Sequence, residues 1–468
     1  MFFTQIDFVV FFLLLLGCLV CISGNTFRKV ILLAASYYFY AHWDYRFLGL
    51  ILISTVVDYH VGKLLAKENT LRRRRLWLGL SIVVNLGILA AFKYANFFIS
   101  SLAYLVRPLG LDYGTLNLIL PLGISFYTFK TLSYVFDSYR HRIDPCASLL
   151  DYALFVGFFP TMVAGPIVRA SQFLPQLKTK RPITVQNLLL GFRLFAIGLF
   201  MKVFVADGIA GYVNYVLDNA AVFDSGTIWL AVIGYSFQLY CDFAGYTSMA
   251  VGVGKILGYD LPENFNFPYL SRNINEFWQR WHITLGSWIR DYIYIPLGGN
   301  RKGAFRTHLN LVVSMMLCGL WHGAAWTFVF WGLLHGVALT VNRMWAIFRV
   351  PVRDPGSGPV FLRFLGWLTT LLTVVVGWVF FRARDFEHAG LLLEKMFYPQ
   401  GGVIWYYPFV LFVLAFCILI HLEELSHWQD FHRLPITAWY TPVTLFTMIW
   451  LCVIFYPKGF NPFIYAQF

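Results

Sequence analysis

The sequence predicts an all-α fold, a polytopic transmembrane helical bundle of about 11–12 spans with re-entrant and interfacial helices. Composition is the first observation behind this prediction, because 59% of the 468 residues are hydrophobic and only 13% are charged. In soluble domains, roughly a quarter of the residues are charged. Phe, Tyr and Trp make up 19% of the chain, and such residues anchor a protein at both membrane interfaces. Lipid must therefore be the solvent for most of this apolar surface.

The spacing of apolar runs along the chain is the second observation. Several runs are shorter than the ~20 residues that a straight crossing needs. We expect such runs to be tilted, broken or re-entrant, which is tolerated only where protein or a water-filled cavity surrounds the backbone. The candidate spans are residues 6–23, 30–43, 47–60, 76–92, 118–137, 187–205, 226–243, 308–322, 324–341, 361–381, 404–420 and 437–456.

The third observation is the placement of charge. The formal net charge is +13, which in a soluble protein would suggest a nucleic-acid partner. Because Lys and Arg cluster in short loops between apolar runs, the positive-inside rule explains this charge better, and no nucleic acid is expected. The run Arg72–Arg75 is predicted to be a cytoplasmic loop. Counting spans from it places the N-terminus and the loop 206–225 outside the cytoplasm.

Two stretches do not fit a regular alternation of spans and loops. The apolar segment 149–165 contains Pro160 and has basic residues on both sides, which favours a hairpin that enters from the cytoplasm and returns. The stretch 258–307 mixes charged residues with Trp and Tyr and contains no clear span. It is predicted to form amphipathic or re-entrant structure on the cytoplasmic side. The nearest thing to a linker is Pro351–Pro359.

His322 is the first candidate catalytic residue, because ionisable side chains at membrane depth are costly. It follows the apolar run 309–321, whose helix would rise about 20 Å and fall short of the ~30 Å hydrocarbon core. His322 is therefore expected inside the bilayer. We interpret Gly319 and Gly323 as leaving room for another group to approach its ring. The alternative is a hydrogen-bonded histidine packed between helices.

His282 is the second candidate, in the amphipathic sequence Phe277-Trp278-Gln279-Arg280-Trp281-His282. Histidine is the natural general base at neutral pH, and two histidines around one pocket could activate a hydroxyl and orient a thioester. An interfacial histidine without catalytic function is the alternative for His282.

The other histidines are predicted to have no chemical role. His335 lies in a Trp- and Gly-rich run, where packing in the core is the expected role. A second set could be drawn as a metal site, but its spacings match no compact ligand pattern. We expect an interfacial loop and no metal there. This set comprises His421, Glu423, Glu424, His427 and His432.

Two long motifs resemble the membrane-bound O-acyltransferase family, and within it the alginate O-acetyltransferase branch. They are residues 277–282, quoted above, and the run Arg-Asp-Tyr-Ile-Tyr-Ile-Pro-Leu-Gly-Gly-Asn-Arg over 290–301. The resemblance covers about residues 30 to 390, with the motifs in the expected order. Supporting matches are Leu-Pro-Leu-Gly-Ile-Ser-Phe-Tyr at 120–127, Ala-Gly-Pro at 164–166, Gln-Leu-Tyr-Cys-Asp-Phe-Ala-Gly-Tyr at 238–246 and Trp-His-Gly at 321–323.

The resemblance implies one integral membrane acyltransferase domain over 1–468 with an active-site core at 238–336. It implies a thin central region where a cytoplasmic tunnel meets an outward-facing cavity. The invariant histidine of the family corresponds to His322, and its second active-site polar position to His282. His322 would act as a general base or as a transient acetyl acceptor, with His282 assisting. The implied location is the bacterial inner membrane.

The resemblance further implies that the acyl donor is cytosolic acetyl-CoA. A separate periplasmic SGNH-hydrolase-like acetyltransferase, within a polysaccharide biosynthesis complex, would complete the transfer to the glycan. Coenzyme A is a polyanion that cannot cross lipid, so a histidine at mid-depth, reached from both faces, would allow transfer without moving the cofactor. Cytoplasmic basic residues could bind its phosphates. The candidate donor- or substrate-binding residues are Arg280, Arg290, Arg301, Tyr240, Asp242 and Trp321, with Lys302 as a further cation.

The expected function is therefore transfer of acetyl groups across the membrane for O-acetylation of an exported polysaccharide, such as alginate, cellulose or a similar glycan. Peptidoglycan acetylation uses chains of the same branch, and D-alanylation of teichoic acids uses a related one. The alternative is a glycan or lipid transporter or flippase, although the two halves of the chain show no paired broken helices. A structural scaffold of a secretion complex is a third possibility.

Overall fold

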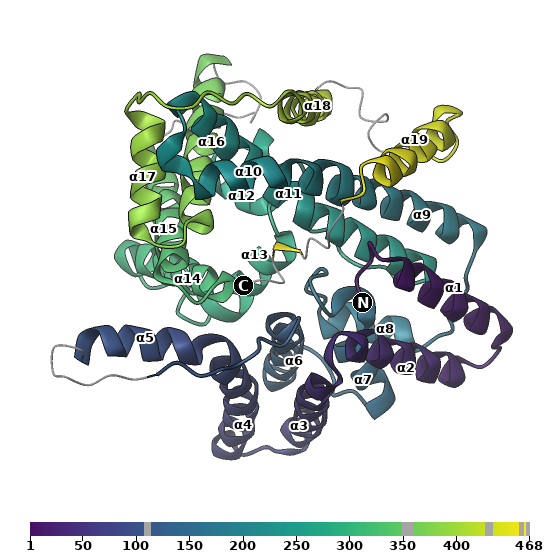
Figure 1. The fold of residues 1–468 in the computed structure, drawn as a ribbon. Coiled ribbons are helices and arrows are strands. Elements are labelled where there is room, and N and C mark those ends of the chain that lie inside the picture. The colour runs from purple at the N-terminus through teal and green to yellow at the C-terminus, as the bar shows by residue number, and fades with distance from the viewer. Residues whose placement is uncertain (107–113, 349–359, 426–433, 458–462, 465–468) are drawn as a thin grey trace. The chain divides into compact units, whose positions relative to one another are not determined.

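The computed structural model describes residues 1–106, 114–348, 360–425, 434–457 and 463–464. The regular secondary structure of these residues is helical, apart from an isolated bridge between Phe223 and Val403. This confirms the predicted all-α class. The chain divides into two compact units, each described by itself below: residues 1–195 with 247–262, and residues 196–246 with 263–468. Figure 1 colours the helices by their position along the chain, from purple at the N-terminus to yellow at the C-terminus.

The first unit contains the helices drawn in purple and blue in Figure 1, together with parts of α9 and α11. Short 3-10 and π-helical turns, labelled η, join several of the α-helices. The elements are α1 (Ile6–Cys21), α2 (Asn25–Asp44), η1 (Tyr45–Phe47), α3 (Leu48–Lys67), α4 (Leu71–Leu89), η2 (Ala90–Tyr94), α5 (Ala95–Val106), α6 (Ile124–Tyr139), α7 (Leu149–Gly157), η4 (Phe159–Thr161), α8 (Ala170–Leu177), α9 (Val185–Phe200) and α11 (Ser225–Ile256).

The second unit contains the end of α9, most of α11 and the helices that follow. Its further elements are η5 (Met201–Asp207), α10 (Gly208–Asp218), η6 (Ala220–Val222), η7 (Pro268–Leu270), α12 (Ile274–Arg280), α13 (Ile283–Ile289), η8 (Arg290–Tyr294), α14 (Ala304–His322), α15 (Trp326–Phe348), α16 (Val360–Arg382), α17 (Phe386–Phe397), α18 (Pro408–Leu425) and α19 (Tyr440–Ile454).

Each of the twelve predicted spans overlaps an α-helix, and the prediction of a polytopic membrane protein is confirmed. By length and composition alone, four continuous helical stretches of the described chain are sufficient to cross a membrane. They are residues 25–67, 71–103, 185–218 and 360–382.

Two segments predicted as loops are helical instead. Residues 206–225 contain α10, and Arg72–Arg75 form the first turn of α4. Arg74 is 7% exposed. It donates to the carbonyl of Leu65 at 2.6 Å, near the end of α3, and to that of Tyr139 at the end of α6. Carbonyls at a helix C-terminus lack partners within the helix, so an arginine that satisfies two of them belongs to the fold rather than to a solvated loop.

The apolar segment 149–165 is not a straight crossing helix, as predicted. Helix α7 ends at Gly157, and the turn η4 follows around Pro160. Lys130 of α6 is 1% exposed and holds this break from inside. Its ammonium donates to the Thr161 hydroxyl at 2.7 Å and to the carbonyls of Phe155 and Val156 at 3.4 and 3.3 Å. The side from which the segment enters the membrane stays a prediction.

Three helical stretches of the described chain contain a π-helical turn, and each turn carries charge. Lys93 lies in η2, Lys202 and Asp207 lie in η5, and Arg290 and Asp291 lie in η8. A π turn adds one residue to the helix and frequently marks a functional region. The predicted linker Pro351–Pro359 lies outside the described residues.

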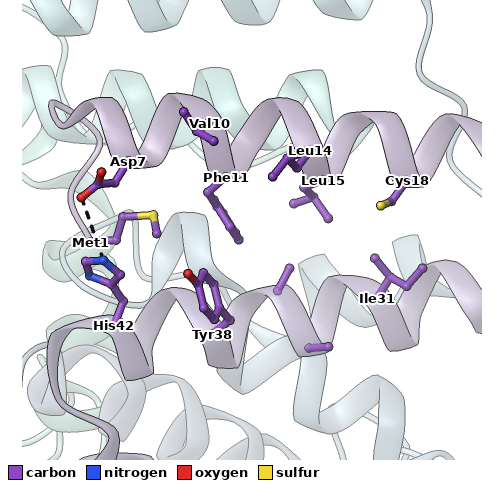
Figure 2. Close-up of a pocket in the computed structure, with 12 residues that line it drawn as sticks. Met1, Asp7, Val10, Phe11, Leu14, Leu15, Cys18, Ile31, Tyr38 and His42 are labelled. Atoms are coloured by element: carbon purple, nitrogen blue, oxygen red, sulfur yellow. Dashed lines mark ion pairs between the residues drawn. The ribbon is translucent and has the colours of Figure 1, made fainter.

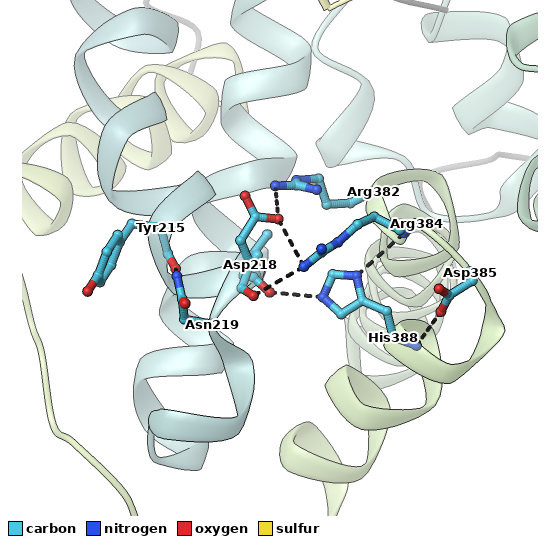
Figure 3. A network of polar contacts seen from close by, with 8 residues as sticks. Tyr215, Asp218, Asn219, Arg382, Arg384, Asp385 and His388 are labelled. Atoms are coloured by element: carbon cyan, nitrogen blue, oxygen red, sulfur yellow. Dashed lines mark hydrogen bonds and ion pairs between the residues drawn. The ribbon is translucent and has the colours of Figure 1, made fainter.

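Salt bridges join the end of α10 to the junction of α16 and α17 (Figure 3). Asp218 lies 3.0 Å from the guanidinium of Arg382 and 3.8 Å from that of Arg384. The ring nitrogen Nε2 of His388 is 2.9 Å from the Leu217 carbonyl, and Asp385 caps α17 by accepting from the His388 N–H at 2.8 Å. The last residues of α16 are therefore fixed at the end of α10.

Helices α14 and α15 form a hairpin whose backbones approach closely through glycines. A β carbon at Gly332 would collide with the carbonyl of Met315, and one at Gly319 would collide with the carbonyl of Phe328. Gly336, four residues after Gly332, faces Val312 in the same way. Small residues at this spacing let membrane helices pack at short range. This contact positions His322, the last residue of α14, against α15.

Gly332→Ala is expected to lower the free energy of unfolding by about 1–3 kcal/mol, the usual cost of overpacking, because the backbone of α14 cannot retreat. The matched control is Gly390→Ala on α17, where an added β carbon meets open space and alanine is the better helix former. Thermal unfolding of the two purified variants in one detergent checks this. Equal midpoints for both variants would contradict the close approach.

Candidate active site

His282 lies at the elbow between α12 and α13, which have seven residues each. Helices this short are not stable alone, so caps and tertiary contacts hold them. Asn273 caps α12 by accepting from the Glu276 N–H at 2.9 Å. His282 has a φ of 41°, which is uncommon for a residue with a β carbon. Its carbonyl accepts from the Gly286 N–H at 3.0 Å and begins α13.

Asn264 determines which nitrogen of His282 carries the proton. Its side-chain oxygen accepts from the Thr284 N–H at 3.1 Å and from the Thr284 hydroxyl at 2.8 Å, and it lies 3.1 Å from Nδ1 of His282. A backbone N–H can only donate, so the carboxamide must present its oxygen here. Nδ1 of His282 therefore donates, and in the neutral ring Nε2 keeps the lone pair that a base needs.

The environment of His282 keeps its imidazole neutral. The side chain is fully buried, and it lies between two short helices rather than in an apolar span. Desolvation by burial lowers the pKa of His282 from 6.5 to about 3. The Asn264 amide that holds Nδ1 is itself neutral, so it offers little to an imidazolium. His282 is thus arranged to accept a hydrogen bond or a transient proton at Nε2.

His322 is 2% exposed and ends α14. Its ring centroid lies 4.8 Å from that of Trp321, 5.1 Å from that of Trp331 on α15 and 5.3 Å from that of Phe381 on α16. Gly323 was predicted to leave room beside the His322 ring, but the space next to it is filled, because a β carbon there would collide with the ring of Phe328. Gly319 and Gly323 therefore serve the contact between α14 and α15.

The two predicted catalytic histidines lie together. Their ring centroids are 6.5 Å apart at an interplanar angle of 61°. Trp321 lies beside both, with its ring 5.9 Å from that of His282. Phe243 of α11 meets His282 edge-on at 4.7 Å. Residues 40 positions apart in the chain thus form one buried imidazole pair enclosed by aromatic rings.

His335 packs behind this imidazole pair, with Trp331 in contact with both His335 and His322, which agrees with the predicted packing role. It is fully buried and lies in α15 one turn after Trp331, at 4.7 Å between ring centroids. Its Nδ1 accepts from the indole N–H of Trp278 at 3.3 Å, which ties α12 to α15. Because α12 leads directly into the elbow at His282, this bond helps to set the separation of the two catalytic candidates.

Asp242 belongs to a buried ion cluster. Its carboxylate lies 2.6 Å from the ammonium of Lys202, which also contacts Asp207 at 2.7 Å. Both Asp242 and Lys202 are 2% exposed. The second oxygen of Asp242 accepts from the Ile464 N–H at 2.8 Å. Asp242 therefore fixes the segment of α11 that places Phe243 against His282.

The other predicted binding residues surround the elbow or lie beyond it. Tyr240 is 7% exposed and its ring lies 6.3 Å from that of Trp281. Arg280 forms an ion pair with Glu276 at 3.0 Å. Arg290 forms one with Asp291 at 2.8 Å, and its own side chain is 63% exposed. Arg301 is exposed on the loop before α14. Their roles toward a donor stay predictions.

Four residues that touch the histidines or orient them were not predicted from the sequence. Asn264, Phe243, Trp331 and Phe381 lie in different elements, and apolar runs give no sign of which aromatic ring faces a histidine. Asn264 stands among alternating Asn and Phe residues over 264–267. That isolated polar pattern, next to the motif of residues 277–282, was the only signal for it.

The histidines near the C-terminus gather no metal ligands within the described part of the chain. No group of three or more His, Cys, Asp or Glu side chains suited to a metal occurs there. His421 is 6% exposed, with its Nδ1 2.8 Å from the Cys417 carbonyl of its own helix. His427 and His432 lie outside the described residues.

Comparison with known proteins identifies relatives over most of the chain. Residues 40–381 match the model of the membrane-bound O-acyltransferase family. The chain is 41% identical over 401 residues to the probable alginate O-acetylase AlgI of Pseudomonas aeruginosa, covering 85% of this chain and 75% of that protein. It is 39% identical over 396 residues to the peptidoglycan O-acetyltransferase of Helicobacter pylori, covering 79% of this chain and 74% of that protein.

A more distant relative carries out a different transfer. The teichoic acid D-alanyltransferase of Bacillus subtilis is 31% identical over 292 residues, which covers 58% of this chain and 71% of that protein.

The lowered pKa of His282 predicts a pH dependence of stability. Between about pH 6.5 and 3 the unfolded chain binds a proton at this residue and the folded chain does not. The stability that His282 contributes is therefore complete above pH 6.5 and is lost as the pH falls toward 3. His282→Asn keeps a donor toward Asn264 and should flatten the fall of the unfolding midpoint between about pH 7 and 4.

The control is His60→Asn, because His60 is exposed on α3 and its replacement should leave the wild-type slope unchanged. Thermal unfolding of the three purified proteins across this pH range makes the measurement. Parallel curves for wild type and His282→Asn would show that His282 is not held neutral.

Proposed function

This chain belongs to the membrane-bound O-acyltransferase family, and from that premise we propose that it transfers acetyl groups from acetyl-CoA to hydroxyls of an exported polysaccharide. It is a multi-pass membrane enzyme of a family that forms esters, and the relatives named above include O-acetylases of alginate and of peptidoglycan. None of those relatives is a transporter or a scaffold. The bacterial inner membrane is the proposed location.

The observation that carries the proposal is the buried imidazole pair. Acyl transfer to a hydroxyl needs a base that removes the hydroxyl proton as the oxygen attacks the carbonyl. His322 and His282 lie 6.5 Å apart between ring centroids, and the bond from His282 to Asn264 leaves Nε2 as an acceptor. A buried site also excludes water, which would otherwise take the acyl group.

We assign the proton transfer to His322 and the orientation of the acceptor to His282. The acceptor hydroxyl gives its proton to a ring nitrogen of His322 while its oxygen bonds to the thioester carbonyl carbon. The carbon–sulfur bond then breaks, and the proton passes from His322 to the leaving thiolate. The products are an O-acetyl ester and free coenzyme A thiol. His282 accepts at Nε2 a hydrogen bond from a second donor of the acceptor molecule, such as a neighbouring hydroxyl or N–H, and so holds the reacting hydroxyl in line with the thioester.

The proposal extends to a separate extracytoplasmic acetyltransferase of the SGNH-hydrolase type that completes delivery to the glycan. In that case the acceptor at His322 is a hydroxyl of the partner rather than of the glycan itself. Labelled acetyl would then leave coenzyme A only when the partner is present to receive it, and would reach polysaccharide only when both proteins are present.

His322→Ala should lower acetyl transfer by about 10²–10⁴-fold, the usual loss on removing a general base, with normal yield and insertion. His282→Ala should also lower it. Transfer of radiolabelled acetyl from acetyl-CoA by purified protein with its partner provides the measurement, and His60→Ala is the matched histidine control. A His322→Ala enzyme that keeps more than about a tenth of the activity would overturn the assignment.

The donor site is proposed at the basic residues of the predicted cytoplasmic stretch, Arg290 and Arg301. Charges that bind phosphates act equally in the ground state and the transition state, so Arg290→Gln and Arg301→Gln should raise KM for acetyl-CoA more than they lower kcat. Arg75→Gln, an exposed arginine at the start of α4, serves as the control.

The ion pair of Arg290 with Asp291 makes a second control available. Asp291→Asn frees the guanidinium while keeping its charge, so it should not raise KM. If KM stays unchanged in both arginine variants, the donor binds elsewhere on the chain.

A further inference from the structure

A groove runs along the first unit between α1 and α2 (Figure 2). Its volume of about 600 Å³ lies within the range of about 300–1,000 Å³ that is typical of sites for small ligands. Phe11 and Leu14 of α1 face Ile31 and Ala35 of α2 across it, and the lining is apolar along most of its length. The small side chain of Ala35 keeps the groove open toward α2.

One end of the groove is polar. Asp7 of α1 and His42 of α2 meet there, with Oδ2 and Nε2 4.0 Å apart, as the dashed line in Figure 2 marks. The two side chains are 60% and 39% exposed, and the contact is an ion pair only when the imidazole is protonated. Because Asp7 is this exposed, its carboxylate can accept a hydrogen bond from outside the protein. Met1 lines the same end, and burial lowers the pKa of its α-amino group to about 6, so at neutral pH that group is mostly uncharged beside Asp7. Tyr38 places a ring one turn before His42.

The length of the groove matches one leaflet of a bilayer. From Asp7 to Cys18, which lines the other end, α1 rises about 16 Å at 1.5 Å per residue. Half of the ~30 Å hydrocarbon core is about 15 Å. Leu14 is 68% exposed and Val10 is 53% exposed, so this face of α1 is bathed by lipid when the helix lies in the membrane.

We propose that this groove binds one phospholipid with a primary ammonium head group, that is, a phosphatidylethanolamine. An acyl chain would lie along the apolar walls, and the ammonium would donate to the Asp7 carboxylate beside His42, a charge-assisted hydrogen bond. An anionic head group without an ammonium would face the Asp7 charge instead. The proposal rests on α1 and α2 alone and holds whichever acyl group the enzyme transfers.

The groove is connected to the broken segment of the same unit. Phe11, one of its walls, meets Phe159 in η4 edge-on at 5.5 Å between ring centroids. On the other wall helix, the Ser36 hydroxyl accepts from the Phe159 N–H at 3.2 Å. A lipid seated between α1 and α2 would thus hold both helices against the turn around Pro160 and stabilise the first unit.

Native mass spectrometry of the full chain, released from nanodiscs that contain equal amounts of phosphatidylethanolamine and phosphatidylglycerol, tests the proposal. We expect one retained phosphatidylethanolamine, favoured about tenfold over phosphatidylglycerol, as one charge-assisted hydrogen bond would give. Asp7→Asn should remove this preference and keep a lipid in place. Ala35→Leu, which fills the groove, should lose the retained lipid.

Two variants serve as controls, Leu13→Phe and Asp144→Asn. Leu13 is 63% exposed on α1 and does not line the groove, and Asp144 is an exposed carboxylate elsewhere in the unit. Both should behave as wild type. Equal retention of the two lipids by wild type would overturn the head-group assignment, and undiminished retention by Ala35→Leu would overturn the groove as the site.

Discussion

Polar groups inside a lipid-solvated bundle must find their partners within the protein, because hydrocarbon offers none and each unsatisfied group costs several kcal/mol. The buried charges of this chain follow that constraint. Lys130 satisfies the carbonyls at the end of α7, where the chain turns at Pro160. Asp58, fully buried in α3, accepts from Ser81 at 2.6 Å and from Asn85 at 2.8 Å. Bends and helix ends can therefore exist inside the apolar part of the bundle.

The same constraint determines the chemistry of the candidate site. The Asn264 oxygen receives the backbone N–H of Thr284, and this single requirement fixes the proton on His282. The hydrogen bond from Trp278 to His335 and the close contact of α14 with α15 then set where the second imidazole lies. An aromatic-walled pair of imidazoles results from contacts among groups that first satisfy one another's hydrogen bonds.

Much of this arrangement was predictable from the sequence. Apolar runs located the long helices, and Pro160 marked the break after α7. The motif at 277–282 and the Trp-His-Gly match at 321–323 identified the two histidines that the fold brings together. Segment 206–225 was misjudged because α10 is short and follows a π-helical turn, so its apolar face is out of register with α9. The role of Asp242 could not be predicted, since its partner Lys202 is 40 residues away and the sequence does not show that the two helices meet.

The π-helical turns give a geometric reason why segment 206–225 was misjudged. One residue of an α-helix turns through about 100°, so an inserted residue rotates everything after it by that angle. In η5 the shift falls where α9 passes into α10, at Lys202 and Asp207. A helix that faces lipid with one stripe before the turn can present a different stripe after it. The π-helical turn therefore shifts the amphipathic pattern around the helix. One continuous helical stretch can then face lipid along part of its length and hold buried charged side chains at the turn.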